Sequence, residues 1–347
     1  MTPLTGPSNL PAVPEQIRAF ARQIDVGQVR LYSIAMTTRF RGITVREGVL
    51  LEGPAGWGEF CPFDDYDDEV SAGWLLTALE AAVLGWPAPV RDQIPINATV
   101  PVVGPERAHA IVTASGCATA KVKVADHPGS LAEDLARLEA VRDALGPTGA
   151  IRVDANGVWD VDTAVARLTA MDAAAGGLQY AEQPCRTIEE LAAVRRRVSV
   201  PIAADESIRR AEDPLRVAVA GAADIAIIKC TPLGGVRRSL AVAEAAGLPC
   251  VISSALETSV GLAAQLALAG ALPELDHACG LGTLSLLRGD TVAGSASLVP
   301  RSGWLPVPAS PPAPDPELLE RHAMGDPKRR AWWIDRLRRT LNILIGS

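Results

Sequence analysis

The hydrophobic positions divide the chain into a first part with long alternating runs and a second part in which short apolar runs and helical stretches take turns. In the first part, "GQVRLYSIAMTTRF" and "TVREGVLLEGPAGWGEF" alternate as half-buried strands do, and residues 53–56 predict a hairpin turn. Apolar residues then recur with a helical period over residues 69–85. Residues 1–94 are therefore expected to form a small α+β unit.

Over residues 95–285 the pattern changes to β-type runs separated by Ala/Leu-rich stretches. Eight runs are strand candidates: "INATV", "AKVKV", "AIRVDAN", "LQYAEQP", "VPIAADES", "DIAIIKC", "PCVISSALE" and "HACGLG". Between them, residues 130–146 repeat Leu and Val every three or four positions, and Thr187 with Glu190 predicts a capping box at a helix start. This alternation predicts an α/β fold with a parallel sheet, and eight strand candidates favour its closure into a barrel.

The last part of the chain, residues 286–347, returns to strand-like and Pro-rich sequence before a final helix. We expect this segment to pack back on the barrel and on the N-terminal unit. Within it, "PKRRAWWIDRLRR" at residues 327–339 is strongly basic. We interpret this run as a helix with a solvated charged face and with its tryptophans packed inward.

Composition places the chain among soluble globular proteins, because its 347 residues are 48% hydrophobic and 21% charged with a formal net charge of −7. The acidic balance argues against a nucleic-acid partner. No apolar run reaches the roughly 18 to 20 residues that cross a bilayer, so we expect a cytoplasmic protein without a membrane partner. The six cysteines lack C-x-x-C spacing and are expected to be reduced core residues. For the oligomeric state, a monomer is favoured.

Ionisable and polar residues close the predicted barrel strands. In chain order they are Lys121 and Lys123, Asp154 and Asn156, Glu182, Asp205 and Glu206, and Lys229. These groups follow one another at intervals of 23 to 31 residues, about one strand plus one helix. A single carboxylate after a strand is more often a helix cap or a loop charge. A regular series at the carboxyl ends of barrel strands, where the active sites of such barrels lie, indicates one ring of charge around one pocket.

Three carboxylates in this ring predict a metal site. Asp154, Glu182 and Asp205 would bring three negative charges into one pocket, and their repulsion is unfavourable unless a cation joins them. An all-oxygen donor set without His or Cys suits a hard ion. We therefore predict that these residues bind Mg²⁺, with Mn²⁺ as a substitute.

The two lysines of "AKVKV" stand two positions apart, so Lys121 and Lys123 both point into the barrel. A lone lysine more often reaches out to solvent, but a neighbouring like charge and partial burial are expected to lower the pKa of one of these amines. Lys229 comes from the opposite side of the ring. A substrate carbon would then meet an amine on each face, which suits removal of the proton next to a carboxylate, with a divalent ion stabilising the enediolate.

Five motifs connect this interpretation to a known family. "KVK", "RVDAN", "AEQP", "ADES" and "IIKCTPLGG" occur in order, and over about residues 40–300 the chain resembles the enolase superfamily, in its muconate-cycloisomerase-like subgroup. "FRGITVREGVLLEG", "GWGEFCPF" and "SSALETSVG" make it most similar to the o-succinylbenzoate synthase family. The resemblance implies a modified TIM barrel, (β/α)₇β, under an α+β capping domain that the N-terminal segment and the C-terminal tail form together.

The resemblance also implies an activity, the Mg²⁺-dependent syn-dehydration of 2-succinyl-6-hydroxy-2,4-cyclohexadiene-1-carboxylate to 2-succinylbenzoate in menaquinone biosynthesis. It implies that Lys123 is the acid/base catalyst, that Lys229 is the cation stabilising the enediolate from the other face, and that Lys121 tunes Lys123. The residues that it implies for substrate contacts or support of the site are Arg152, Asn156, Ser253, Ser254 and Gly280.

The same lysines and carboxylates would serve N-acylamino acid racemisation or another activity of the subgroup equally well. The eighth strand candidate lacks the Asp-x-Asp that would grip a substrate ammonium, and the seventh lacks a His base. Outside the family, a Schiff-base aldolase barrel and a noncatalytic ligand-binding barrel stay open.

The capping region is expected to close over the ring of charge. We expect Phe40, Phe60 and Phe63 to supply apolar cover and Arg41 to supply one charge for a second carboxylate of the substrate.

Overall fold

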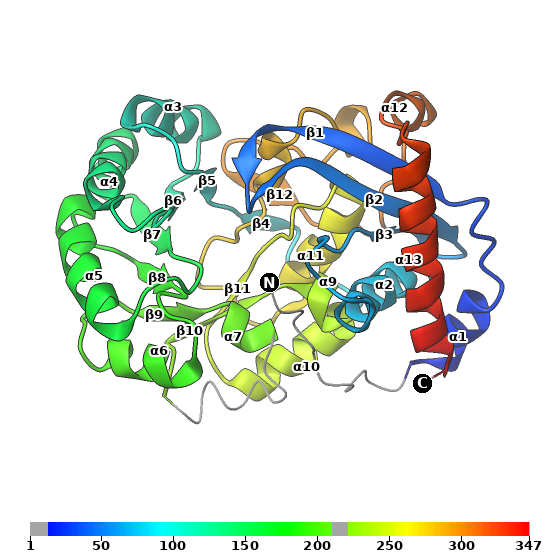
Figure 1. Ribbon diagram of the computed structural model, residues 1–347, viewed down its shortest axis with the longest axis horizontal. Coiled ribbons are helices and arrows are strands. Elements are labelled where there is room, and N and C mark those ends of the chain that lie inside the picture. The colour runs from blue at the N-terminus through cyan, green and yellow to red at the C-terminus, as the bar shows by residue number, and fades with distance from the viewer. Residues whose placement is uncertain (1–12, 210–220, 347) are drawn as a thin grey trace.

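The computed structural model describes residues 13–209 and 221–346, and its centre is a seven-stranded parallel sheet in the order β11-β10-β9-β8-β7-β6-β5. The strands are β5 (Ala98–Val100), β6 (Thr119–Lys123), β7 (Ala150–Asp154), β8 (Tyr180–Glu182), β9 (Ile202–Ala204), β10 (Ile225–Ile228) and β11 (Cys250–Ile252). The helices that cover the sheet from outside are α3 (Pro105–Ser115), α4 (Leu131–Leu145), α5 (Val161–Ala175), α6 (Ile188–Arg195), α10 (Val236–Ala246) and α11 (Ser259–Ala271) (Figure 1). Two short helices, α7 (Glu206–Arg209) and α9 (Cys230–Leu233), follow β9 and β10.

The eighth predicted strand takes the form of two parallel bridges. Cys279 pairs with Ile96 just before β5, and Gly280 pairs with Ser253 just after β11. Residues 279 and 280 therefore join the two edges of the sheet, and the predicted α/β barrel is confirmed. The predicted capping box of Thr187 and Glu190 is also present at the start of α6.

Alternation along the barrel strands sends polar side chains inward. On β6 and β7, the side chains that pack in the apolar layer under the helices are Ala120, Val122, Ile151 and Val153. The residues between them point into the barrel: Lys121, Lys123, Arg152 and Asp154. Register pairs Lys123 with Asp154 on the neighbouring strand. A lysine and a carboxylate thus meet at the carboxyl end of the sheet because of strand register alone.

An antiparallel sheet and helices form the capping domain. The sheet contains β1 (Arg30–Phe40), β2 (Ile43–Gly53) and β3 (Gly56–Phe60), with the predicted turn between β2 and β3. The helices are α1 (Glu15–Ala21) and α2 (Asp68–Val83). The Asp67 carboxylate caps α2 by accepting a hydrogen bond from the backbone N–H of Val70. This order confirms the α+β unit that the sequence predicts.

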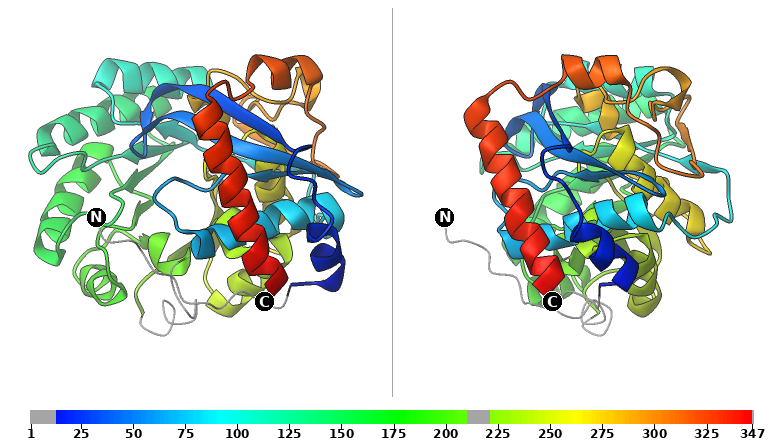
Figure 2. Two further views of the ribbon diagram at one scale, coloured as in Figure 1. Left: turned by 45° about the vertical axis from the view of Figure 1, so that its right-hand side comes forward. Right: turned by 90° about the vertical axis from the view of Figure 1, so that its right-hand side faces the viewer.

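The C-terminal segment contacts both the barrel and the cap. β12 (Trp304–Pro306) pairs antiparallel with β4 (Gln93–Pro95), which precedes the first barrel strand. After α12 (Pro316–Arg321), the long helix α13 (Pro327–Gly346) runs beside the capping strands, as both views of Figure 2 show. Trp333 and Leu337 of α13 are buried in the same apolar cluster as residues of β1, β2, β3 and α2.

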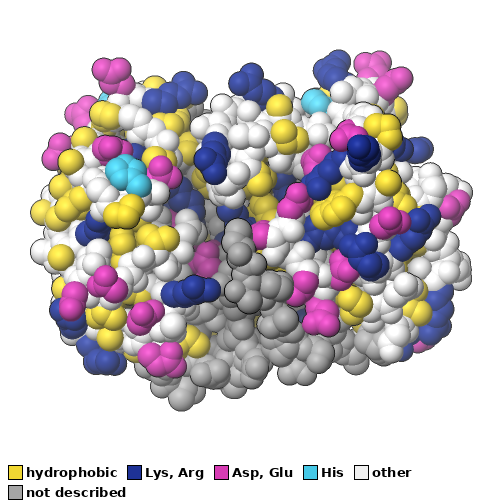
Figure 3. Space-filling model, in the orientation of Figure 1, with side chains coloured by type: hydrophobic (Ala, Val, Ile, Leu, Met, Phe, Trp, Pro, Cys, Tyr) yellow, Lys and Arg dark blue, Asp and Glu magenta, His cyan; other side chains and the backbone are white. Residues whose placement is uncertain are grey.

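The basic run on α13 is divided between its two faces, so the prediction of a solvated charged face is correct only in part. Trp333 is buried, and the buried Arg336 donates hydrogen bonds to the carbonyls of Phe63 and Tyr66. Arg329 lies farther out and forms ion pairs with acidic residues of the cap. Lysine and arginine side chains gather on the exposed side of this helix in Figure 3.

The cysteines also agree with the sequence prediction, because all six are buried and free of disulfide bonds. Within the described ranges, no helix combines the length and the apolar character that spanning a membrane requires.

Close packing of the capping sheet on α2 gives a stability prediction at Gly58 of β3. A Cβ atom at this position would lie 2.0 Å from the backbone carbonyl oxygen of Ala78 in α2, and a backbone atom cannot move aside as a side chain can. We expect Gly58→Ala to lower the free energy of unfolding by about 2 kcal/mol or more, because overpacking forces the helix away from the sheet.

Thermal unfolding measures this effect, with Gly325→Ala as the matched control. A Cβ atom at Gly325 would meet no other atom within 4 Å. Equal melting temperatures for the two variants would contradict the close approach of β3 to α2.

Candidate active site

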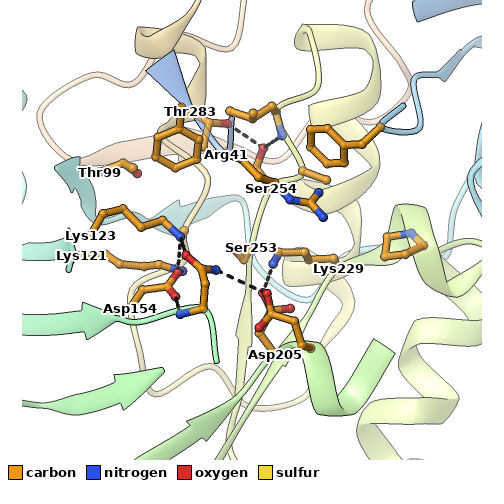
Figure 4. A pocket seen from close by; sticks show the side chains of 18 of the residues that line it. Arg41, Thr99, Lys121, Lys123, Asp154, Asp205, Lys229, Ser253, Ser254 and Thr283 are labelled. Carbon is orange, nitrogen blue, oxygen red and sulfur yellow. Dashed lines mark hydrogen bonds and ion pairs between the residues drawn. The ribbon is translucent and has the colours of Figure 1, made fainter. Parts of the chain in front are cut away.

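A cavity opens at the carboxyl ends of the barrel strands, where the capping domain covers them (Figure 4). Most of the predicted site residues line this cavity: Lys121, Lys123, Asp154, Asn156, Asp205, Lys229, Ser253, Ser254 and Gly280. Glu182 lies directly beneath, in contact with Lys121. Residues from the carboxyl ends of β6, β7, β8, β9, β10 and β11 and from the bridge at Gly280 are therefore brought together around one space.

Both lysines of β6 reach carboxylates on the neighbouring strands. Lys123 Nζ lies 2.5 Å from Asp154 Oδ2 and donates a hydrogen bond to Asn156 Oδ1 at 2.8 Å. Lys121 Nζ lies 2.5 Å from Glu182 Oε1 and 3.0 Å from Asp154 Oδ2. The two ammonium groups consequently share one carboxylate, that of Asp154.

Lys229 stands across the cavity from these two lysines. It follows β10 directly, and its ammonium group forms an ion pair with the carboxylate of Asp205. Figure 4 shows Lys121 and Lys123 on one side of the cavity and Lys229 on the other. A carbon atom bound between them would have an amine on each side.

The close charges shift the proton affinities of the buried groups. Burial alone would raise the pKa of Asp154, but the charges of Lys121 and Lys123 outweigh it and hold this pKa well below the usual range. Burial raises the pKa of Glu182, and the nearby charge of Asp154 raises it further. Burial would lower the pKa of Lys121, but the charges of Asp154 and Glu182 hold it well above the usual value. The expected lowering of a lysine pKa is therefore not met at Lys121 in this arrangement.

The three carboxylates have the donor chemistry of a site for a hard divalent cation. Glu182 Oε2 is buried and has no hydrogen-bond partner among the described residues. Lysines contact one oxygen each of Asp154, Glu182 and Asp205, and no three His, Cys, Asp or Glu side chains in the described ranges form a ready metal cluster. The orphaned oxygen in an all-oxygen set fits a cation that would compete with the lysines for Asp154, Glu182 and Asp205.

Two predicted support residues occupy different layers of the barrel. Asn156 lines the cavity, and its backbone N–H donates a hydrogen bond to Asp154 Oδ1 at 3.1 Å. Arg152 is fully buried below the cavity, where its Nε donates to Gln179 Oε1 at 2.6 Å and its guanidinium carbon lies 4.7 Å from the centre of the Tyr180 ring. Arg152 therefore reaches the site through the residues around it and does not line it.

The expected cover from the capping domain is correct for three residues of four. Phe40, Arg41 and Phe63 line the cavity. Phe60 is wrong, because it is fully buried in the cap and packs edge-on against Trp333. Phe60 lies on the face of β3 that points into the capping domain, and the other face of β3 points toward the barrel.

Arg41 lies at the turn between β1 and β2, in the left-handed backbone region with a φ of 48°. Its guanidinium carbon lies 3.9 Å from the centre of the Phe63 ring, and its Nη2 donates a hydrogen bond to the Tyr66 hydroxyl at 2.8 Å. The guanidinium thus stacks on the cavity wall and brings a positive charge to the covered side.

Several cavity residues escaped the sequence analysis. These are Trp74, Thr99 and Thr283, whereas Glu206, which the sequence placed in the ring of charge, lines the cavity beside Asp205 as expected. The alternation of polar and apolar residues in "INATV" is a signal that could have identified Thr99. Trp74 lies in an apolar helix, and nothing in the sequence distinguishes it from a core tryptophan.

The orphaned oxygen of Glu182 gives a prediction on metal binding. We expect Glu182→Gln to raise the dissociation constant for Mn²⁺ tenfold or more, because an amide keeps the shape of the side chain and removes its negative charge. Titration of Mn²⁺ by electron paramagnetic resonance measures the constant. Glu133→Gln, at an exposed position on α4, is the control, and equal constants for both variants would exclude Glu182 from the metal site.

Family models match most of this architecture. Residues 105–311 match the model described as enolase C-terminal domain-like, and residues 31–82 match the model described as enolase N-terminal domain-like. The o-succinylbenzoate synthase of Thermobifida fusca is 63% identical over 278 residues, which cover 80% of this chain and 86% of that protein. The o-succinylbenzoate synthase of Mycolicibacterium smegmatis is 53% identical over 311 residues, which cover 89% and 94%.

Solved structures share the fold at lower sequence identity. The N-succinyl Arg/Lys racemase from Bacillus cereus superimposes with a TM-score of 0.72 at 18% identity, over 85% of this chain and 97% of that one. The L-Ala-D/L-Glu epimerase from Bacillus subtilis gives a TM-score of 0.68 at 23% identity, over 82% and 96%. These structures are similar to this chain in the fold of the barrel and of the capping domain.

Proposed function

The chain belongs to the enolase superfamily and to the o-succinylbenzoate synthases within it, and we propose that it catalyses the syn-dehydration of 2-succinyl-6-hydroxy-2,4-cyclohexadiene-1-carboxylate to 2-succinylbenzoate. One observation carries this proposal: Lys123 and Lys229 approach the cavity from opposite sides above buried carboxylates. Such a site can remove a proton next to a carboxylate and stabilise the charge that results. The reaction would serve menaquinone biosynthesis in the cytoplasm.

Enzymes of this superfamily generally depend on a divalent metal, and we propose Mg²⁺ for this chain, held by Asp154, Glu182 and Asp205. When bound, a divalent ion supplies positive charge that stabilises enediolate oxygens. It would also compete with the lysines for the carboxylates.

Lys123 would act twice on the same face of the substrate. Its neutral amine takes the proton from the carbon that bears the carboxylate, and the ammonium then gives that proton to the hydroxide leaving the neighbouring carbon. One C–H and one C–O bond break, water leaves and the ring becomes aromatic. Lys229 would hold positive charge against the enediolate from the other face, and Lys121 would keep Lys123 in place through their shared contact with Asp154.

The charge around the cavity supports a substrate with two carboxylates. Four cationic side chains gather at the site: Arg41, Lys121, Lys123 and Lys229. Four carboxylates oppose them: Asp154, Glu182, Asp205 and Glu206. A divalent ion would leave about two uncompensated positive charges, which a dicarboxylate neutralises. Arg41 on the capping side is our candidate for the succinyl carboxylate, and Ser253, Ser254 and Gly280 are candidates for its chain.

Racemisation of N-succinyl amino acids uses the same charges, so a kinetic comparison tests the proposal. We expect kcat/KM for the cyclohexadiene substrate to exceed that for N-succinyl amino acids at saturating Mg²⁺. Formation of 2-succinylbenzoate is measured by absorbance and racemisation by polarimetry. A higher kcat/KM for the amino acids would reject the dehydratase in favour of the racemase.

The acid/base assignment gives a second prediction. Lys123→Ala is expected to lower kcat by a factor of roughly 10³ or more with little change in melting temperature, because proton transfer loses its carrier. The control is Lys328→Ala, at an exposed position on α13. A rate within tenfold of the native enzyme would remove Lys123 from this role.

A Schiff-base mechanism predicts different results with borohydride and with EDTA. Borohydride would then trap a substrate on Lys123 or Lys229, and activity would survive EDTA. We expect the opposite result, complete loss of turnover with EDTA and recovery with Mg²⁺.

A further inference from the structure

The segment that follows β11, residues 253–256, forms one wall of the cavity. Ser253, Ser254, Ala255 and Leu256 all line it. Leu256 has a φ of 68°, in the left-handed region that a residue with a branched side chain seldom adopts. A conformation that costs about 1 kcal/mol or more persists only where surrounding contacts impose it. The contacts that hold segment 253–256 therefore decide the shape of the substrate site.

A buried arginine of the capping domain provides two of these contacts. Arg46 of β2 is only 2% exposed, and its Nε donates a hydrogen bond to the carbonyl of Leu256 at 2.9 Å. Its Nη2 donates to the carbonyl of Ala255 at 3.2 Å and also to the carbonyl of Cys61. Hydrogen bonds from a charged donor are about twice as strong as neutral ones, so the guanidinium fixes the direction of the peptide groups on both sides of Leu256.

The same guanidinium also touches the cover of the cavity. Its central carbon lies 4.6 Å from the centre of the Phe63 ring and 5.9 Å from that of the Trp74 ring. Both aromatic residues line the cavity. Arg46 thus stands behind the corner where the capping wall and segment 253–256 meet, without lining the cavity itself.

Acidic residues secure the chain just beyond segment 253–256. Glu59 of the cap accepts hydrogen bonds from Thr258 Oγ1 at 2.6 Å and from the backbone N–H of Gly261 at 2.8 Å, at the start of α11. Glu257 accepts from Ser254 Oγ at 2.6 Å and from the backbone N–H of Ala255 at 2.8 Å. The N–H and hydroxyl groups of this region are thereby fixed, and the carbonyls of residues 255 and 256 depend on Arg46.

We propose that Arg46 is a positioning residue that holds Leu256 of segment 253–256 in its left-handed conformation and so sets the affinity for the substrate end that contacts this segment. This role rests on the proposed function only in its choice of substrate. Without the guanidinium, the carbonyls of Ala255 and Leu256 have no charged donor, and Leu256 is free to relax to a negative φ. Ala255 and Leu256, which line the cavity, would then shift and change the shape of its wall, while the lysines and carboxylates on β6 to β10 keep their places.

Arg46→Met tests this role, since methionine keeps much of the length of the side chain and removes every donor. We expect KM to rise tenfold or more while kcat falls less than threefold, because binding contacts are lost and the proton-transfer groups are not touched. The dissociation constant for Mn²⁺ should stay within twofold of the native value. Arg46→Lys, which retains the charge and some donors, should recover part of the KM.

The matched control is Arg142→Met. Arg142 of α4 also donates to backbone carbonyls, and they lie before β7 and β8 at the end of the barrel away from the cavity: those of Gly146, Gly149, Ala175 and Gly177. This variant should lose thermal stability and keep its KM. Comparable KM values for Arg46→Met and Arg142→Met, or a parallel loss of Mn²⁺ affinity in Arg46→Met, would overturn the proposal.

Two further outcomes need a separate readout: failure of Arg46→Met to fold, and failure of the native enzyme to dehydrate the proposed substrate. If Arg46→Met does not yield folded protein, Arg46→Lys must still raise KM at least threefold where Arg142→Lys does not, and equal values would reject the role. Native enzyme that racemises N-succinyl amino acids but does not dehydrate the cyclohexadiene would overturn the proposed function alone. The Arg46 comparison is then made with the amino-acid substrate.

Discussion

Close attraction between lysines and carboxylates inside the barrel mouth is the interaction on which the other parts of this molecule depend. Lys121 and Lys123 share Asp154, Lys121 also reaches Glu182, and Lys229 pairs with Asp205. Charges buried this deeply are tolerated only when each has a close partner of opposite sign. Strand register supplies the first pairing, and closure of the sheet brings the third lysine to face the others.

The direction of a side chain could be predicted from the sequence where the two-residue period of a strand determines it. Residues two apart on a strand share a face, so the inward direction of Lys121 and Lys123 followed from "KVK" itself. Prediction failed where position depends on contacts between distant segments. Phe60 and Phe63 look equivalent in the sequence, yet one packs on Trp333 of α13 and the other lines the cavity. The high pKa of Lys121 likewise arises from carboxylates on two other strands.

The position of Arg46 also depends on contacts between distant segments of the chain. An arginine on an alternating strand is typical of a solvated face, and its burial becomes evident only when residues 255 and 256 come within reach of its guanidinium. Hydrogen bonds from Arg46 therefore connect the capping domain directly to the backbone of the barrel. In the roles we propose, selectivity for the substrate and the chemistry of proton transfer come from different parts of the molecule, joined through backbone carbonyls.

The packing of α13 against the first three strands has a consequence for biosynthesis. A ribosome releases the N-terminal strands long before the final helix, whose Trp333 and Leu337 complete their apolar cluster. Part of the apolar surface of the nascent β1 to β3 sheet therefore stays uncovered until α13 has been synthesised. A chain truncated before α13 would leave this apolar surface exposed, where it could bind chaperones or aggregate.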